Sequence, residues 1–287
     1  MGCADLVPGV SGGTVALITG IYADLLKAIS SVGDGLKQFA TLQFKEGLST
    51  IHIRFLFCLM LGIGLAIVGL ASLMHFLLEQ YPIPTWGLFF GLVAASIFVV
   101  GTEANVWRSG LAPFFIGTML AYLVVGMIPV STPEALWFIF LAGMIAICAM
   151  ILPGISGAFL LLILGKYQFI TGALKNPFVT DNIVIIAIFC TGCATGLLGF
   201  SRFLSYMMDK HRGATMALLT GFMLGSMRKI WPWKEILESI TVRGKVHVLS
   251  TKNIIPTAFD SELVITAALA LTGFIVVITL QKMTRAD

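Results

Sequence analysis

The chain has 287 residues, of which 58% are hydrophobic and only 11% are charged, and its mean hydropathy is +0.98. Because a soluble domain carries about 25% charged residues, this composition excludes an ordinary soluble fold and indicates an integral membrane protein. Lysine and arginine exceed aspartate and glutamate by 18 to 14. In a membrane protein, such a small excess indicates cytoplasmic loops and anionic lipid headgroups rather than a nucleic-acid partner.

The cysteines do not indicate a disulfide framework or a metal centre. Four of the five, Cys58, Cys148, Cys190 and Cys193, lie in apolar runs, where we expect them to be small packing residues. The spacing of Cys190 and Cys193 is typical of redox or zinc sites, but no second pair and no histidine cluster accompanies it. We therefore expect neither a metal nor a cofactor.

Charge-poor stretches mark the expected membrane segments, because a helix needs about 20 apolar residues to cross the hydrocarbon core. In chain order they are residues 6–23, 55–78, 80–102, 109–133, 135–165, 182–201, 213–227 and 263–281. Stretch 135–165 is too long for one straight span, and stretch 6–23 is short. Each contains a Pro-Gly-x-Ser-Gly motif, beginning at Pro8 and at Pro153. Since proline removes a backbone donor and glycine favours turns, a helix must break at both motifs.

The two breaks belong to an internal repeat. Matching residues keep the same order along the two halves, with an offset that shortens from 145 to 132 and then to 130. The matched pairs are Pro8 and Pro153, Ser11 and Ser156, Gly12 and Gly157, Tyr22 and Tyr167, Phe57 and Phe189, Gly64 and Gly196, Thr85 and Thr215, Gly91 and Gly221, and Ser96 and Ser226. Such an ordered set of matches indicates a duplicated unit.

The repeat predicts an all-α integral membrane protein made of two inverted-topology repeats, residues 1–133 and 134–287. Each repeat is expected to hold a re-entrant Pro-Gly-x-Ser-Gly helical hairpin plus three transmembrane helices. A hairpin adds no net crossing of the membrane, so each repeat crosses it three times. Because three is an odd number, the second repeat has the opposite orientation to the first, as in many transporters. We expect that the leading arm of the first hairpin is truncated. The alternative is that this arm is vestigial. We expect both termini on the cytoplasmic side.

The breaks are the first candidates for chemistry, because irregular backbone at membrane depth is tolerated only against protein or a wet cavity. Backbone amides and hydroxyls at a helix start favour an anion such as phosphate. This predicts a phosphate-binding set of Ser11, Gly12, Gly13, Thr14, Ser156 and Gly157. The alternative is that the breaks are only turns that let the hairpins reverse.

Four charged residues extend this set. Arg202 interrupts an apolar stretch, and a membrane arginine usually has a partner or a function. Arg228 and Lys166 are further phosphate-binding candidates, although Arg228 could instead extend to the headgroups and Lys166 could mark the interface. Asp5 stands three residues before Pro8, where it could couple ion movement or simply face water. The scattered histidines form no catalytic set, so we do not expect an enzyme.

Three segments resemble the bacterial polyprenyl-phosphate transporter family, formerly known only as a domain of unknown function. They are A-D-L-V-P-G-V-S-G-G-T-V-A-L-I-T-G-I-Y from Ala4, L-P-G-I-S-G-A-F-L-L-L-I-L-G-K-Y from Leu152, and L-T-G-F-M-L-G-S-M-R-K-I-W-P-W from Leu219. The second motif has Ala158 and Phe159 where the first has Gly13 and Thr14, so the two breaks need not bind phosphate equally.

The resemblance implies a translocase in the bacterial cytoplasmic (inner) membrane. It would return undecaprenyl phosphate, the lipid carrier of cell-wall synthesis, from the outer to the inner leaflet. Its partners would be the polyprenyl-phosphate lipid and the membrane, with no nucleic acid. A channel or ion-coupled transporter for a small inorganic anion is the alternative.

Overall fold

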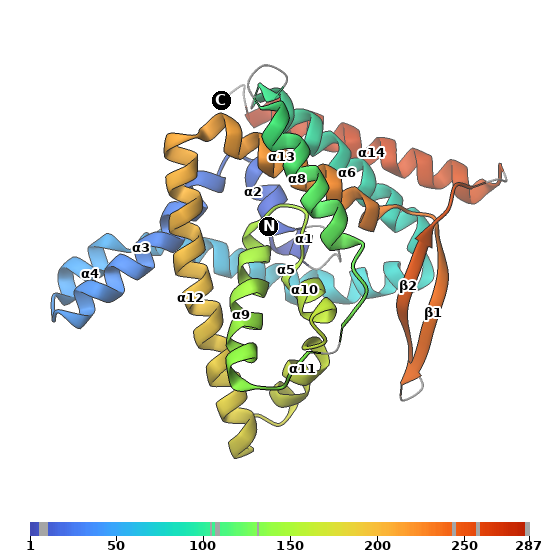
Figure 1. Ribbon diagram of the computed structural model, residues 1–287. Helices are drawn as coiled ribbons and strands as arrows, with labels where there is room; N and C mark the ends of the chain where they lie inside the picture. Colours follow the sequence, from blue (N-terminus) through green and yellow to red (C-terminus); the bar gives the residue numbers. More distant parts are fainter. Residues whose placement is uncertain are drawn as a thin grey trace.

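The computed structural model describes residues 1–5, 11–103, 105–106, 110–130, 132–242, 245–256 and 259–284. Helices account for nearly all regular structure in this part of the chain (Figure 1). Pro8, the proline of the first break, lies outside the described residues, so the helix break expected there stays a prediction.

The first half begins with short helices and continues with long apolar ones. In chain order these are α1 (Gly2–Asp5), α2 (Gly12–Ile18), α3 (Tyr22–Ala40), α4 (Phe44–Thr50), α5 (Ile53–Gln80), α6 (Pro82–Glu103) and α8 (Leu111–Val125). Figure 1 shows α3 and α4 extending to one side of the molecule.

The second half repeats this order of short and long helices. Its elements are α9 (Leu136–Ile151), α10 (Gly157–Ile163), α11 (Tyr167–Lys175), α12 (Thr180–Lys210), α13 (Arg212–Ile230), strands β1 (Lys234–Val242) and β2 (Lys245–Asn253), and α14 (Ser261–Thr284). The antiparallel β1–β2 hairpin lies on the side opposite α3 and α4 (Figure 1). The sequence predicts an all-α protein, so this hairpin is a departure from the expected fold.

Four helices in the described part of the chain are long and apolar enough to cross a membrane: α5, α6, α12 and α14. Six full spans were expected. The segment predicted at 109–133 is helical in α8 for only 15 residues, because the chain leaves the helix after Val125. Helix α13 has 19 residues, but Arg228 and Lys229 occupy its last turn and shorten its apolar part. The chain is thus a multi-pass α-helical membrane protein, and its described residues contain fewer full-length spans than the six predicted.

Beyond the second break, two short helices form a sharply bent pair. Helices α10 and α11 meet at 110° across the short gap between Ile163 and Tyr167. Gly165 lies in that gap with φ +64°, a left-handed conformation that suits glycine. A broken span and a re-entrant loop would both show this bend.

Close helix crossings tie the two halves together. Helix α14 of the second half packs along α6, and α8 of the first half packs along α13. A Cβ added to Gly91 of α6 would collide with the Ala270 carbonyl of α14, and one added to Gly221 of α13 would collide with the Phe114 carbonyl of α8. Small residues at membrane helix crossings allow backbones to approach this closely.

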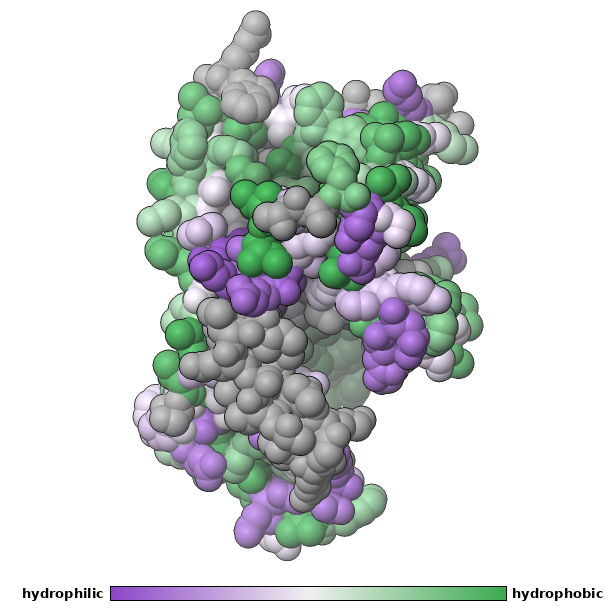
Figure 2. Space-filling view, turned by 90° about the vertical axis from the view of Figure 1, so that its right-hand side faces the viewer, coloured by the Kyte–Doolittle hydropathy of each residue, from purple (hydrophilic) through white to green (hydrophobic). Residues whose placement is uncertain are grey.

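The outer surface is strongly apolar. Helix α5 exposes Phe57, Met60, Leu65 and Val68, and only 6% of its most apolar window is buried. Figure 2 shows an apolar surface over much of the upper half of the face that carries the β-hairpin, with hydrophilic residues at mid-height and at the lower end. Lipid is the solvent in which such a surface is stable.

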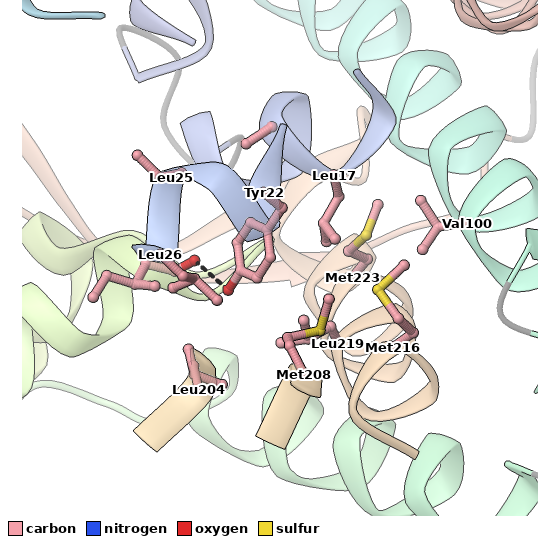
Figure 3. Packing of buried hydrophobic residues seen from close by; sticks show 12 residues of the cluster. Leu17, Tyr22, Leu25, Leu26, Val100, Leu204, Met208, Met216, Leu219 and Met223 are labelled. Atoms are coloured by element: carbon pink, nitrogen blue, oxygen red, sulfur yellow. Dashed lines mark hydrogen bonds between the residues drawn. The ribbon is translucent and has the colours of Figure 1, made fainter. Parts of the chain in front are cut away.

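The largest buried cluster lies where the short helices of the first break meet the second half (Figure 3). Leu17 and Tyr22 come from α2 and α3, the two helices after the first break. Ile151, Leu204 and Met223 come from α9, α12 and α13. The core therefore holds the first break against three helices of the other half.

Candidate site at the helix breaks

The first break is closed by internal hydrogen bonds. Ser11 is the N-cap of α2, and its Oγ accepts from the Gly13 amide at 3.1 Å. The Gly12 amide donates to Asp5 Oδ1 at 2.7 Å. Both amides were expected to be free for a ligand, and in this structure each has an acceptor from the chain itself. The Asp5 carboxylate thus occupies a position that an anionic ligand would take.

Thr14 differs from its neighbours at this break. Its side chain is 2% exposed, and its Oγ1 has no hydrogen-bond partner among the described residues. A buried hydroxyl without a partner is unfavourable by about 1–3 kcal/mol. Thr14 therefore offers an unused polar group next to the helix start.

The first break touches the helix that leads into the second. Ser11 Oγ lies 3.4 Å from the Met150 carbonyl oxygen, and Tyr22 Oη donates to the Ile151 carbonyl at 3.1 Å (Figure 3). A Cβ on Gly13 would lie 2.7 Å from the same Ile151 oxygen. These carbonyls are at the end of α9, where helical partners are lacking because the chain breaks at Pro153. The two motifs are thus brought together across 139 residues of sequence.

The second break is held mainly by packing. Gly154 has φ +86°, and a Cβ there would collide with Ser226 Oγ of α13. Gly157 begins α10 so close to the Ala146 carbonyl that a Cβ would collide with it. Ser156 is the N-cap residue of α10, is partly buried and makes no side-chain cap bond. Its hydroxyl is therefore more available than that of Ser11.

Lys166 lies away from both helix starts, at the far end of α10. It is 2% exposed, and its Nζ donates to the Thr132 carbonyl at 2.9 Å. The rings of Phe138 and Phe169 lie 5.8 and 5.5 Å from the same nitrogen. These contacts, with Thr132 at the end of the first half and with two rings of the second half, occupy the ammonium and favour a packing role.

Arg202 forms an ion pair that the sequence did not predict. Its guanidinium contacts the Asp34 carboxylate of α3 and lies against Gly33. The side chains are 38% and 53% exposed. The pair joins α12 to α3, the second helix after the first break.

Arg228 lies at another place, in the last turn of α13. Its guanidinium carbon is 4.5 Å from the centre of the Tyr122 ring, and it lines a cleft with a volume of ≈ 740 Å³.

The candidates therefore divide into a group at the breaks, comprising Asp5, Ser11, Gly12, Gly13, Thr14, Ser156 and Gly157, and three separate cations. The sequence identifies Tyr22 only as a repeated residue and does not predict its contact at the breaks. No sequence pattern indicates that the carbonyls at the end of α9 lie there.

Comparison with known proteins decides the family. The model of the undecaprenyl phosphate translocase-like family matches residues 1–248. The chain belongs to that family. Two curated relatives agree with the match, and both are named polyprenyl-phosphate transporter. The one from Vibrio cholerae serotype O1 is 39% identical over 98% of this chain and 93% of its own length. The one from Staphylococcus aureus is 31% identical over 81% of this chain and 83% of its own.

The family resemblance expected from the motifs is confirmed over nearly the whole chain. No solved structure matches the chain.

Proposed function

We propose that this protein is a translocase that carries undecaprenyl phosphate from the outer to the inner leaflet of the bacterial cytoplasmic membrane, for reuse in cell-wall synthesis. The names of the two relatives support the substrate class. The observation that carries the proposal is the contact between Ser11 of the first break and the Met150 carbonyl of α9, the helix that leads into the second break. It places a hydroxyl of the first break beside that helix in an otherwise apolar molecule.

We further propose that residues 1–133 and 134–287 are inverted repeats, each with a re-entrant hairpin and three transmembrane helices, and that both termini are cytoplasmic. Matched hydrogen bonds support the repeat. Thr85 Oγ1 donates to the Leu77 and Tyr81 carbonyls, and Thr215 Oγ1 donates to those of Met207 and His211. The offset is 130 for every member of the two sets, since 215 − 85, 207 − 77 and 211 − 81 all equal 130.

The helix crossings support a two-fold relation between these repeats. Gly91 meets Ala270, and its repeat partner Gly221 meets Phe114. Gly117 meets Leu218, and Gly273 meets Leu88, the repeat partner of Leu218. If the two halves are exchanged, the crossing of α6 with α14 therefore becomes the crossing of α13 with α8. A two-fold axis in the membrane plane would allow the same path to open to either side.

In the proposed mechanism, the phosphate replaces Asp5 at the Gly12 amide. The hydroxyls of Thr14 and Ser156 then contribute donors that have no partner or no cap bond in this structure. Because Asp5 must leave with its negative charge, we propose that a cation or proton neutralises it, which couples ion movement to transport. The prenyl chain stays in the surrounding lipid.

Ser156→Asp tests this role, because Ser156 makes no cap bond that the change would break. The added carboxylate should repel the phosphate and stop movement of labelled polyprenyl phosphate across proteoliposomes. Ser156→Ala should reduce transport only slightly, since one neutral hydrogen bond contributes about 0.5–1.5 kcal/mol. Ser49→Asp, at an exposed position in α4, is the matched control. Undiminished transport by Ser156→Asp would contradict the role of the breaks, and transport of inorganic phosphate instead of the lipid would favour the small-anion alternative.

A further inference from the structure

An open cleft lies between the ends of α8 and α13 and the base of the β-hairpin. Its volume is ≈ 740 Å³, within the range of about 300–1,000 Å³ that holds small-molecule ligands. Phe90, Ile128 and Leu224 provide apolar lining, whereas Arg228, Lys252 and Asn253 provide polar groups. None of its lining residues belongs to either break, and the cleft joins a basic side to an apolar one.

The basic side comes from two different elements. Arg228 is in the last turn of α13 and Lys252 is in β2, and both are exposed. The ion pairs found in the described residues, His75 with Glu79 and Arg202 with Asp34, leave these two cations without a carboxylate partner. Asn253 Nδ2 donates to the Arg228 carbonyl at 2.8 Å and so holds the strand against the helix end. Two unneutralised cations in one cleft favour an anionic ligand.

The position of the Arg228 guanidinium is fixed by its neighbours. It lies over the face of Tyr122, with 4.5 Å between the guanidinium carbon and the ring centre. A Cβ on Gly126 would collide with its Nη1, so only glycine leaves room for this stacking. A side chain that merely extends to the headgroups would not need such a platform. The planar guanidinium is well suited to bind a phosphate group through two hydrogen bonds.

We propose that this cleft is a docking site for a phosphate monoester that carries a prenyl chain, with the phosphate bound by Arg228 and Lys252 and the first isoprene units against Phe90 and Leu224. The proposal rests on the proposed function and adds a binding step before the breaks. The volume exceeds what a phosphate alone requires, which supports an occupant with an apolar part. A free phosphate would use the cations but not the apolar lining.

Binding to the purified full chain in detergent tests the proposal, with geranylgeranyl phosphate, inorganic phosphate and geranylgeraniol as separate probes. Geranylgeranyl phosphate should bind more tightly than either of the others. Arg228→Gln should weaken its binding about tenfold or more, as expected for loss of a charge-assisted hydrogen bond. Arg54→Gln, at an exposed position at the start of α5, is the matched control and should leave binding unchanged.

Gly126→Ala separates the geometry of the cleft from its charge. The backbone at Gly126 has φ −86°, which alanine adopts without strain, so the added methyl should act by displacing the guanidinium from Tyr122. Weaker binding in Gly126→Ala, with Gly64→Ala unaffected because nothing lies within 4 Å of a Cβ there, would support the stacked arrangement.

Unchanged binding in Arg228→Gln, or equal affinity for inorganic phosphate, would overturn the docking cleft and leave the proposed function standing. The proposed function has its own readout, because a wild-type protein that moves no polyprenyl phosphate across vesicles would contradict it even if the cleft binds the probe.

Discussion

Tyr22 donates its phenolic hydrogen to the carbonyl oxygen of Ile151 at 3.1 Å, and the ring is 2% exposed. Tyr22 begins α3, the second helix after the first break, and Ile151 ends α9, the helix before the second break. One hydrogen bond thus connects the two motifs that the sequence repeat had paired only by pattern. Because α9 ends there, no amide within the helix can replace this donor.

Tyr22→Phe should therefore loosen the junction. The change keeps the ring but leaves a buried carbonyl without this donor, so we expect a loss of about 1–3 kcal/mol. Thermal unfolding in detergent measures the loss. Tyr167→Phe is the matched control, because Tyr167 is the repeat partner and is 41% exposed. An equal effect of the two changes would contradict the special position of Tyr22.

The helix crossings give a second stability prediction. Gly91→Ala should destabilise the protein, because the methyl would enter the backbone of α14 at Ala270. Gly64→Ala should be neutral or slightly stabilising, because nothing lies within 4 Å of a Cβ there and alanine is the better helix former by about 1 kcal/mol. Melting temperatures of the two variants in the same detergent compare the positions directly. A stable Gly91→Ala protein would mean that α6 and α14 do not cross as closely as described.

Much of the helix pattern follows from the sequence, because apolar stretches and proline–glycine breaks have strong local causes. The stretch at 55–78 forms α5, and the motif at Pro153 separates α9 from α10, as predicted. The β-hairpin could not be predicted in this way. Its strands carry mixed polar residues, and pairing such as that of Lys234 with Asn253 depends on contacts distant in sequence.

The candidate site shows the same division between local and distant causes. The capping role of Ser11 follows from its place before a helix start, and the structure shows it as the N-cap of α2. The occupied Gly12 amide does not follow, because it depends on how the chain brings Asp5 back to α2. Likewise, the partner of Arg202 is Asp34, 168 residues away, and no spacing rule connects them.

Arg202 and Asp34 provide a functional prediction. Because both side chains are more than a third exposed, the ion pair should contribute at most about 1 kcal/mol to stability. We expect Arg202→Ala to stop transport while the protein remains folded, and Arg202→Lys to restore it only partly because it lacks the planar fork. Asp34→Asn should leave transport intact. The same transport loss in Asp34→Asn would mean that the ion pair, and not headgroup binding, is what Arg202 supplies.

Lys234 at the base of the β-hairpin gives a prediction about ionisation. Burial, and to a smaller extent the Lys229 ammonium, lowers the pKa of Lys234 from its ordinary 10.5 to about 8. Its Nζ donates to the Lys229 carbonyl at 2.5 Å and lies 4.3 Å from the Trp86 ring centre. Since the folded pKa is depressed, the docked hairpin should gain stability as pH rises from about 8 to 10.5.

Lys229→Met should raise the pKa of Lys234, because the repelling charge is removed. The pH dependence of amine labelling at Lys234, followed by mass spectrometry, measures this shift. Lys175→Met, at an exposed position in the last turn of α11, should leave it unchanged. A pKa of Lys234 that does not respond to Lys229→Met would contradict the close approach of the two side chains.

Asp5 provides the most direct test of coupling. Its carboxylate accepts from the Gly12 amide, the donor that the proposed mechanism assigns to the phosphate. Asp5→Asn keeps an acceptor oxygen of similar shape but removes the charge that must be neutralised when the phosphate arrives. We therefore expect the variant to bind polyprenyl phosphate as well as or better than the wild type, while transport driven by an ion gradient across proteoliposomes is lost. Asp24→Asn, in the first turn of α3, is the matched control and should behave like the wild type in both measurements. If Asp5→Asn still responds fully to the gradient, Asp5 is only a cap for α2 and the coupling step lies elsewhere.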